Sequence, residues 1–284
     1  MDYVAVSFVR HAADMELVRD ALRKKKADIP LIAKIEKPEA MEHIDEIIRA
    51  SDGLMVARGD LGVEMSPERV PVIQKMLIRR ANEAGIPVIT ATQMLESMTL
   101  HSTPTRAEAN DVANAVLDGS DAVMLSAETS TGRYPVKAAA MMERIIRVTE
   151  GQGDHGAAIY CGKGSYSDAV AEAAVTAARD IGARFVVAFT HSGYTARLLS
   201  KFRPTVPIIA FAPFEAVVRR MALYWGVMPM LMKHQLSTDE RFREIERTLL
   251  KARLVKRGDS IVITGSAPIG GSGKTNLMKL HRIG

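Results

Sequence analysis

The first half of the chain alternates short apolar runs with longer amphipathic segments. The apolar runs have the length of buried strands and lie at residues 3–9, 31–36, 53–59, 86–92 and 121–126. Helical patterns follow these runs, at residues 14–24, 38–50, 67–84, 105–117 and 135–149. Strands that alternate with helices in this way predict a parallel sheet of about five βα units. Five units are too few to close a barrel, so we expect a partial TIM-type (β/α) barrel.

A glycine-rich stretch at residues 151–165 interrupts the alternation, and we place a linker there. It separates a partial (β/α)8 barrel, residues 1–150, from a separate α/β carboxy-terminal domain, residues 166–284. In that domain we expect a helix at residues 167–181 and strands at residues 185–189, 207–211, 227–232 and 260–264. Residues 275–282 are predicted to add one more strand, in the antiparallel direction. The fold class is therefore α/β in both parts.

Composition narrows the class of protein. With 284 residues, of which 47% are hydrophobic and 25% charged, the chain can bury a core. No run approaches the roughly 18 apolar residues of a membrane span, and no secretory leader pattern is present, so we expect a cytoplasmic protein without a membrane partner. Cys161 is the only cysteine, which excludes an internal disulfide and a thiolate metal cluster. The net charge is +5, but basic and acidic residues are interspersed, which favours anionic metabolites over nucleic acid as partners.

Polar residues stand at the end of every predicted strand of the first half. In parallel βα architectures, functional groups collect where strands end and the following loops begin. The residues are Ser7 and Arg10, Lys34 and Glu36, Arg58 and Asp60, Thr92 and Gln93, and Ser126 and Glu128. Polar ends on five strands in succession predict a catalytic face.

Lys34 and Glu36 are two residues apart on one predicted strand, so their side chains project to the same side and predict a charge pair. Glu36 and Asp60 follow neighbouring strands and together make an all-oxygen site that suits Mg²⁺ or Mn²⁺. Zinc is disfavoured because no histidine pair is near in sequence. Simpler interpretations stay open, namely a salt bridge between strands for Lys34 and Glu36, and a loop or helix-capping role for Asp60.

Two threonines of the first half have a simple structural interpretation. Thr92 follows an apolar run, where a hydroxyl often satisfies backbone groups at a strand end. Thr105 and Glu108 have the spacing of a capping box, and we assign them to the start of a helix.

Four longer runs are specific enough to compare with a known family. They are AKIEKPEAMEHIDEI, SDGLMVARGDLGVEM, PVITATQMLESM and PTRAEANDVANAVLDGSDAVMLSAETSTGRYP. Through them the chain resembles pyruvate kinase without a gap from about residue 2 to residue 149, and more loosely to residue 284. The resemblance implies a cytoplasmic glycolytic enzyme that is tetrameric and allosteric. It also implies phosphoryl transfer from phosphoenolpyruvate to ADP, which yields pyruvate and ATP.

The resemblance further implies roles for individual residues. Lys34 would steady the phosphoryl group in transit and the enolate oxygen, and Glu36 with Asp60 would hold the magnesium ion. Thr92 would lie beside the methylene carbon, with Ser126 in the proton relay behind it. The substrate-binding residues would be Lys34, Ala57, Gly59, Asp60 and Thr92, with the backbone from Ala57 to Asp60 receiving the substrate carboxylate.

The resemblance does not cover the amino-terminal part of the family. That part contributes three barrel strands, a lid domain, the ligands of K⁺ and the arginines that contact the nucleotide. K⁺ is therefore implied by the family, while its ligands are absent from these 284 residues. We expect the chain alone to be impaired in phosphoryl transfer, and we expect the open edges of its sheet to need a partner.

The second domain contains the run THSGYTARLLSKFRP, which resembles the loop where allosteric members bind a sugar phosphate. Hydroxyls and amides would bind the phosphate at a helix amino terminus, from Thr190, Ser192, Gly193, Tyr194 and Thr195. A helix cap without a ligand is an equally good interpretation. Residues 265–275 would form the other lip, and their GSGKT ending is not a P-loop, because Pro268 stands where that motif needs glycine.

Two other functions stay open at this point. The first is a metal-dependent aldolase or lyase that acts on pyruvate-type enolates without a nucleotide. The second is a non-catalytic regulatory or assembly fragment that keeps the second domain.

Overall fold

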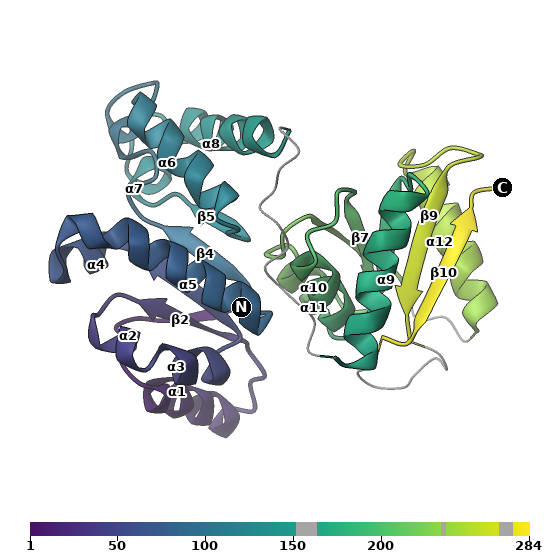
Figure 1. Cartoon of the computed structure of the whole chain (residues 1–284), viewed down its shortest axis with the longest axis horizontal. Helices are drawn as coiled ribbons and strands as arrows, with labels where there is room; N and C mark the ends of the chain where they lie inside the picture. The colour runs from purple at the N-terminus through teal and green to yellow at the C-terminus, as the bar shows by residue number, and fades with distance from the viewer. Residues whose placement is uncertain (152–163, 234–236, 267–274) are drawn as a thin grey trace. The chain divides into compact units, whose positions relative to one another are not determined.

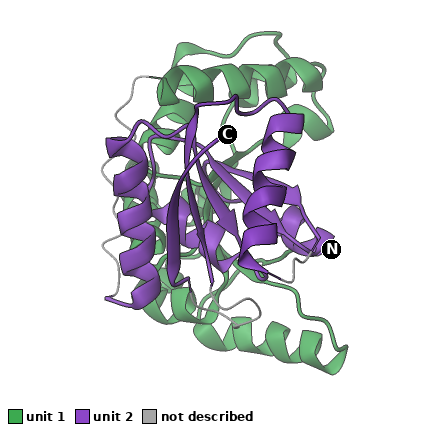
Figure 2. Ribbon diagram, turned by 90° about the vertical axis from the view of Figure 1, so that its right-hand side faces the viewer, with its two compact units in different colours: residues 1–159 green, residues 160–284 purple. Residues whose placement is uncertain are grey.

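The computed structural model describes residues 1–151, 164–233, 237–266 and 275–284. The chain divides into two compact units, residues 1–159 and 160–284 (Figure 2). This division falls within the predicted linker, most of which lies outside the described residues, as does Cys161.

Unit 1 is built on a five-stranded parallel sheet in the order β1-β2-β3-β4-β5, which confirms the predicted series of βα units. The strands are β1 Val4–Val6, β2 Leu31–Ile35, β3 Gly53–Ala57, β4 Val88–Ala91 and β5 Ala122–Met124. The helices are α1 Ala12–Lys24, α2 Glu39–Glu42, α3 Ile44–Ala50, α4 Arg58–Glu64, α5 Val70–Ala84, α6 Arg106–Leu117, α7 Ala127–Ser130 and α8 Pro135–Glu150, with 3-10 turns η1 Pro67–Arg69 and η2 Glu96–Thr99.

The helices cover the face of the sheet to which every second residue of β2 projects. Leu31, Ala33 and Ile35 of β2 lie in one buried cluster with apolar side chains of α1, α3 and α5, and α1 and α3 pack side by side (Figure 1). Because side chains alternate along a strand, Lys34 projects to the other face of the sheet. The helices thus bury one face, while on the opposite face Lys34 lies in register with the buried apolar residue Met55 of β3.

Three differences from the predicted elements concern backbone that the apolar pattern does not reveal. The predicted helix at residues 38–50 is two helices, divided at His43, whose ψ of 13° departs from the helical value. The predicted strand at residues 53–59 ends at Ala57, and Arg58 begins α4, where we expected a loop. The first strand is shorter than predicted and spans only Val4–Val6.

Unit 2 is an α/β domain with strand order β10-β9-β6-β7-β8. Its strands are β6 Phe185–Phe189, β7 Ile208–Ala212, β8 Val227–Leu231, β9 Ser260–Gly265 and β10 Leu277–Arg282, and its helices are α9 Tyr166–Asp180, α10 Tyr194–Lys201, α11 Glu215–Met221 and α12 Thr238–Lys251. The pairs β6–β7, β7–β8 and β6–β9 are parallel, whereas β10 runs antiparallel to β9, which confirms the prediction for the tail.

Helices cover both faces of this second sheet (Figure 2). Apolar residues of α9, α10 and α11 pack with Val186, Ala210 and Val262 on one face, and α12 packs with Val187 and Phe211 on the other. The chain leaves β6 for β7 and β8 on one side and later returns to β9 on its other side. The point between β6 and β9 is therefore a topological switch point, where α/β domains commonly bind ligands. Among the described residues of both units, no helix is long and apolar enough to cross a membrane.

The predicted capping box at the start of α6 is present. Thr105 Oγ1 accepts the Glu108 amide at 3.2 Å, and the Thr105 amide donates to the Glu108 carboxylate at 2.7 Å. The same carboxylate also accepts the Ser97 amide at 2.6 Å and the Ser97 hydroxyl at 2.5 Å. Burial alone would raise the pKa of Glu108, but the hydrogen bonds from Ser97 and Thr105 outweigh it, so that pKa is lowered. Glu108 thus joins η2 to α6.

We expect Glu108→Gln to lower the free energy of unfolding by about 1–2 kcal/mol at neutral pH, because charge-assisted hydrogen bonds are lost. The pKa of Glu108 is lower in the folded chain than the ordinary value of 4.5, so its stabilisation is present above that value. The stabilisation is lost as the pH falls through the folded pKa. Urea unfolding of both proteins at neutral and acidic pH measures the difference.

The matched control is Glu143→Gln, which removes an exposed ion pair with Arg147 on α8. Exposed pairs of this kind contribute about 0–0.5 kcal/mol, so we expect little change. An equal loss in both variants, or a loss in Glu108→Gln that does not depend on pH, would contradict the role assigned to Glu108.

Candidate active site

The carboxyl ends of the five strands of unit 1 lie along one edge of the sheet, because every pairing in it is parallel. Polar and charged side chains follow all five strands directly or after one residue. They are Ser7, Glu36, Arg58, Thr92 and Ser126. This edge is the candidate active site.

Lys34 and Glu36 form the predicted charge pair. Lys34 Nζ lies 2.6 Å from Glu36 Oε1 and donates to Ser7 Oγ at 2.9 Å. The Glu36 side chain is 1% exposed and that of Lys34 is 25% exposed. The carboxylate is thus enclosed in the protein, while the ammonium group reaches solvent at the sheet edge.

The second oxygen of Glu36 holds the turn that follows β1. Glu36 Oε2 accepts the Phe8 amide at 2.6 Å. Phe8 has a φ of 57°, in the left-handed region that large side chains rarely adopt. Phe8 is 54% exposed, and the centre of its ring lies 5.8 Å from the Lys37 ammonium group. Both oxygens of Glu36 are therefore engaged, one by a cation and one by a backbone amide.

The backbone from Ala57 to Asp60 turns from β3 directly into α4. Ala57 ends the strand, Arg58 is the first helical residue, and Asp60 lies exposed in the first turn. The Gly59 amide donates to Thr92 Oγ1 at 2.8 Å, which joins this turn to the end of β4. A Cβ atom at Gly59 would lie 3.4 Å from Thr92 Oγ1, which is an ordinary van der Waals distance, so the two segments are in direct contact here.

Thr92 lies in an unusual backbone conformation at the end of β4. Its φ is 68°, and that of Gln93 is 54°. Thr92 Oγ1 also donates to the Ala91 carbonyl at 2.6 Å. The sequence predicted a strand-end hydroxyl that satisfies backbone groups, and the structure contains these bonds.

Glu128 fixes the turns after β4 and β5. This carboxylate is fully buried and accepts the Ser126 amide at 2.8 Å and the Leu95 amide at 3.0 Å. Ser126 precedes the first turn of α7 and is half-buried. The sequence placed Glu128 at the catalytic face, whereas in the structure its contacts are with the backbone of the face.

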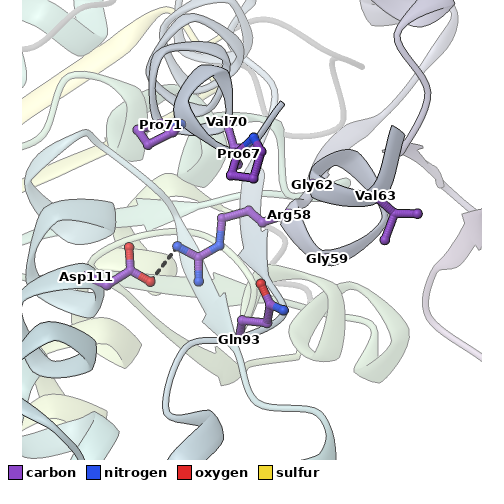
Figure 3. A pocket seen from close by; sticks show the side chains of 9 residues that line it. All are labelled: Arg58, Gly59, Gly62, Val63, Pro67, Val70, Pro71, Gln93 and Asp111. Atoms are coloured by element: carbon purple, nitrogen blue, oxygen red, sulfur yellow. Dashed lines mark hydrogen bonds and ion pairs between the residues drawn. The ribbon is translucent and has the colours of Figure 1, made fainter. Parts of the chain in front are cut away.

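A cavity of about 370 Å³ opens beside this edge (Figure 3). Arg58 and Asp111 lie in its wall, with Arg58 Nη1 2.6 Å from Asp111 Oδ2. Gln93, Val63 and Val70 are also among the lining residues. Nothing in the local pattern pairs Arg58 with Asp111, because 53 residues separate them along the chain.

Oxygen ligands suited to a hard divalent cation are present at the edge. Glu36 and Asp60 follow neighbouring strands, and their closeness stays a prediction. Among the described residues, no group of three or more histidine, cysteine, aspartate or glutamate side chains is arranged to hold a metal ion. A site here would therefore take only one or two protein carboxylates, as magnesium sites commonly do.

The predicted phosphate loop of unit 2 forms a tight turn before α10. Gly193 has a φ of 89° and donates its amide to Thr190 Oγ1 at 3.0 Å. Thr195 Oγ1 shares a hydrogen bond of 2.8 Å with Thr275 Oγ1. Ser192 is exposed. Thr190 and Thr195, two of the four hydroxyl side chains of the predicted loop, thus bond within the protein. Residues 267–274 of the proposed second lip at residues 265–275 lie outside the described part of the chain.

The sequence analysis missed Arg241 on α12. Its side chain is 3% exposed, and its guanidinium lies 4.2 Å from the Phe189 ring centre at the end of β6. Nη1 donates to the Ser266 carbonyl at 3.4 Å, and Nε has no hydrogen-bond partner among the described residues. Burial lowers the pKa of Arg241. Its place in a helical pattern of mixed charge gave no sign that it is buried.

Comparisons with known proteins give a consistent result for both units. Residues 1–139 match the family described as pyruvate kinase, barrel domain, and residues 168–281 match pyruvate kinase, alpha/beta domain. Pyruvate kinases of Sporosarcina psychrophila and Geobacillus stearothermophilus are 46% and 47% identical over the whole chain, which spans 49% of each relative. The crystal structure of a pyruvate kinase from Cryptosporidium parvum superimposes with a TM-score of 0.93 at 37% identity, and the match covers 100% of this chain and 59% of that one. The chain thus spans about half the length of the curated relatives it matches.

We expect Glu36→Gln to lower the free energy of unfolding by about 2–4 kcal/mol, because it leaves the Lys34 ammonium group without its anionic partner. Together with Lys34→Met and the double variant, it forms a double-mutant cycle that isolates the pair. The coupling energy should be about 1–3 kcal/mol. Urea unfolding of the four proteins measures it.

A second cycle on the exposed pair Arg79–Glu83 of α5 is the control, with an expected coupling of about 0.3–0.5 kcal/mol. A coupling between Lys34 and Glu36 no larger than this value would show that the buried pair does not stabilise the site.

Proposed function

Because this chain belongs to the pyruvate kinase family, we propose that it carries the phosphoenolpyruvate site of a cytoplasmic glycolytic enzyme. The reaction is phosphoryl transfer from phosphoenolpyruvate to ADP, which yields pyruvate and ATP. The observation that carries this proposal is the cluster of Lys34, Glu36 and Ser7, at the same sheet edge as Thr92.

Lys34 supplies the positive charge that such a transfer needs. The migrating phosphoryl group carries charge on its oxygens, and catalysis of its transfer is mostly positioning and electrostatic stabilisation. The Lys34 ammonium group is fixed by Ser7 and Glu36, yet part of it is open to solvent. It can therefore approach a phosphoryl oxygen, and afterwards the enolate oxygen, with little rearrangement.

Thr92 and Ser126 account for the second half of the reaction. The enolate left by phosphoryl transfer must be protonated at its methylene carbon, and a positioned hydroxyl or a water molecule beside it can deliver the proton. Thr92 Oγ1 is held by the Gly59 amide and the Ala91 carbonyl, and Ser126 follows the neighbouring strand. We assign Thr92 to the proton-delivering position and Ser126 to the relay behind it, with the backbone from Ala57 to Asp60 as the acceptor of the substrate carboxylate.

Glu36 and Asp60 would hold Mg²⁺ or Mn²⁺. Both are carboxylates, as a hard cation prefers, and they follow neighbouring strands at the sheet edge. Glu36 Oε1 would exchange its contact with Lys34 for the cation, while Oε2 keeps the Phe8 amide. When bound, the ion supplies further positive charge to substrate oxygens. K⁺ is a second cation that membership of this family suggests.

We also assign unit 2 a regulatory role. The turn from Thr190 to Thr195 would bind a phosphate ester such as a sugar phosphate, and the buried Arg241 brings positive charge to the same end of β6. A homotetramer is the assembly that we propose for the complete enzyme. No observation favours an aldolase, a lyase or a purely structural fragment, and the similarity continues through the second unit, which a lyase would not need.

We expect the 284 residues expressed alone to give negligible ADP-dependent pyruvate formation, because their relatives carry about as much chain again. Positioning of two substrates can supply roughly 7–11 kcal/mol of barrier lowering, so an incomplete site loses most of the rate. Turnover should appear when the amino-terminal half of a related enzyme is added. A lactate dehydrogenase-coupled assay measures both conditions, and Lys34→Met should lower the restored rate at least tenfold, because each 1.4 kcal/mol of lost charge stabilisation is a factor of ten.

Two further measurements test the site in the isolated chain. Pyruvate methyl protons should exchange with solvent in a magnesium-dependent manner, weakly in the unaltered chain and not in Lys34→Met.

Manganese binding, followed by electron paramagnetic resonance, should be lost in Glu36→Gln and Asp60→Asn. It should persist in Glu64→Gln, which changes an exposed carboxylate of the same helix as Asp60. Equal manganese binding by all four proteins would refute the metal site.

For unit 2, we expect the double variant Thr190→Ala, Ser192→Ala to bind phosphate esters more weakly. The loss should be about 1 kcal/mol per neutral hydrogen bond and up to about twice that for charge-assisted bonds. Calorimetric titration of the chain with a sugar bisphosphate measures it. Thr205→Ala, on another exposed loop of the same unit, is the control. Unchanged affinity in the double variant would count against this site.

A further inference from the structure

Thr92 and Gln93 are consecutive residues in the left-handed backbone region, with φ values of 68° and 54°. The left-handed region disfavours every residue with a side chain, and β-branched threonine most of all. Conformations of this kind persist only where the surroundings hold them, and they concentrate at functional sites. The turn after β4 must therefore be held by its neighbours.

The residue that holds the turn is Arg58. Its Nε and Nη2 both donate to the Thr92 carbonyl, at 3.2 Å and 2.7 Å. The next residue, Gly59, donates its amide to Thr92 Oγ1 at 2.8 Å. The start of α4 thus donates hydrogen bonds to both the carbonyl and the hydroxyl of Thr92. These bonds hold the backbone and the side chain of Thr92 in one conformation.

Arg58 is itself fixed from two further helices. It is 8% exposed, and its Nη1 donates to Asp111 on α6 at 2.6 Å and to Gln74 on α5 at 3.4 Å. Its Nη2 also contacts Met94 Sδ at 2.7 Å. Figure 3 shows the guanidinium between Asp111 and Gln93 in the cavity wall. Every nitrogen of the guanidinium has a partner, so the group cannot turn away from Thr92 without losing several contacts.

We propose that Arg58 is a positioning residue for Thr92. Its guanidinium keeps Thr92 and Gln93 left-handed and so aims Thr92 Oγ1 along the sheet edge, and Asp111 orients the guanidinium. This inference rests on the proposed function, in which Thr92 lies beside the substrate methylene carbon. The Arg58 side chain acts through Thr92 and makes no contact with the substrate.

A purely structural ion pair between Arg58 and Asp111 makes a different prediction. A lysine at position 58 keeps the positive charge for Asp111, but it lacks the planar fork that places two donors on one carbonyl. If the ion pair were the whole role, Arg58→Lys would leave the Thr92 backbone unchanged. If Arg58 positions Thr92, the same variant allows Thr92 and Gln93 to leave the left-handed conformation.

The first test is nuclear magnetic resonance of the intact chain with labelled threonine and glutamine. The Cα and Cβ chemical shifts of Thr92 and Gln93 should move from left-handed toward extended values in Arg58→Lys and stay unchanged in Arg79→Lys, an exposed arginine on α5. Asp111→Asn should give a smaller change in the same direction. Unchanged Thr92 shifts in both Arg58→Lys and Asp111→Asn would overturn the proposal.

The second test uses Gln93→Gly, because glycine adopts the left-handed conformation without strain. This variant should raise the melting temperature by about 2–4 °C, the shift expected for a chain of this size when one strained residue is relieved. The loss of melting temperature caused by Arg58→Lys should be smaller in the Gln93→Gly background. A lower melting temperature in Gln93→Gly alone would show that the turn stores no strain.

Activity provides a separate readout in the complemented enzyme. Arg58→Lys should lower kcat more than it raises KM, because proton delivery depends on the placement of Thr92 Oγ1, whereas the other substrate-binding residues are left unaltered. The spectroscopic and thermal results need no turnover. An inactive complemented enzyme whose Thr92 shifts respond to Arg58→Lys would refute the proposed function while supporting the positioning role.

Discussion

The carboxylate of Glu36 is the constraint on which the candidate active site depends. Only 1% of this side chain is exposed, and an uncompensated charge at that depth would cost several kcal/mol. The structure compensates it with the Lys34 ammonium group and with the Phe8 amide. These two contacts come from β2 itself and from the turn after β1, so one carboxylate fixes the distance between two strand ends. The left-handed conformation of Phe8 follows from the same demand, because it points the amide at Glu36.

The same arrangement recurs along the sheet edge, where a charged side chain forms hydrogen bonds with the backbone groups of a turn. Glu128 accepts the amides of Leu95 and Ser126, and Arg58 donates to the Thr92 carbonyl. Buried backbone groups that leave the ladder of a sheet need partners, and here charged side chains supply them. The turns that hold the candidate site are therefore stiff without being regular secondary structure. Rigid placement is what a site built for charge stabilisation requires.

The sequence predicted the parts of this structure that follow from local periodicity. Five parallel strands, the antiparallel tail and the capping box of Thr105 and Glu108 were all predicted, and the two-residue spacing of Lys34 and Glu36 was enough to infer their pairing. The missed features depend on long-range contacts. Nothing in the residue types of Phe8, Thr92 or Gln93 indicates a positive φ, because the groups that bond to these turns come from other parts of the chain. The pairing of Arg58 with Asp111 and the burial of Arg241 likewise need the tertiary structure.

The candidate site has one part at the interior strands of the sheet and another part at its edge strands. β2, β3 and β4 are each paired on both sides and mostly buried, whereas β1 and β5 are short, partly exposed and paired on one side only. Lys34 lies on an interior strand and Glu36 and Thr92 directly follow interior strands, whereas Ser7 and Ser126 follow the edge strands. The groups assigned to charge stabilisation and to the enolate are thus held by the most stable part of the sheet. The edge groups have fewer contacts, and local stability falls with contact density. Enolate chemistry, which needs mainly the interior group, should therefore depend less on additional chain than phosphoryl transfer, which must also hold a nucleotide in line.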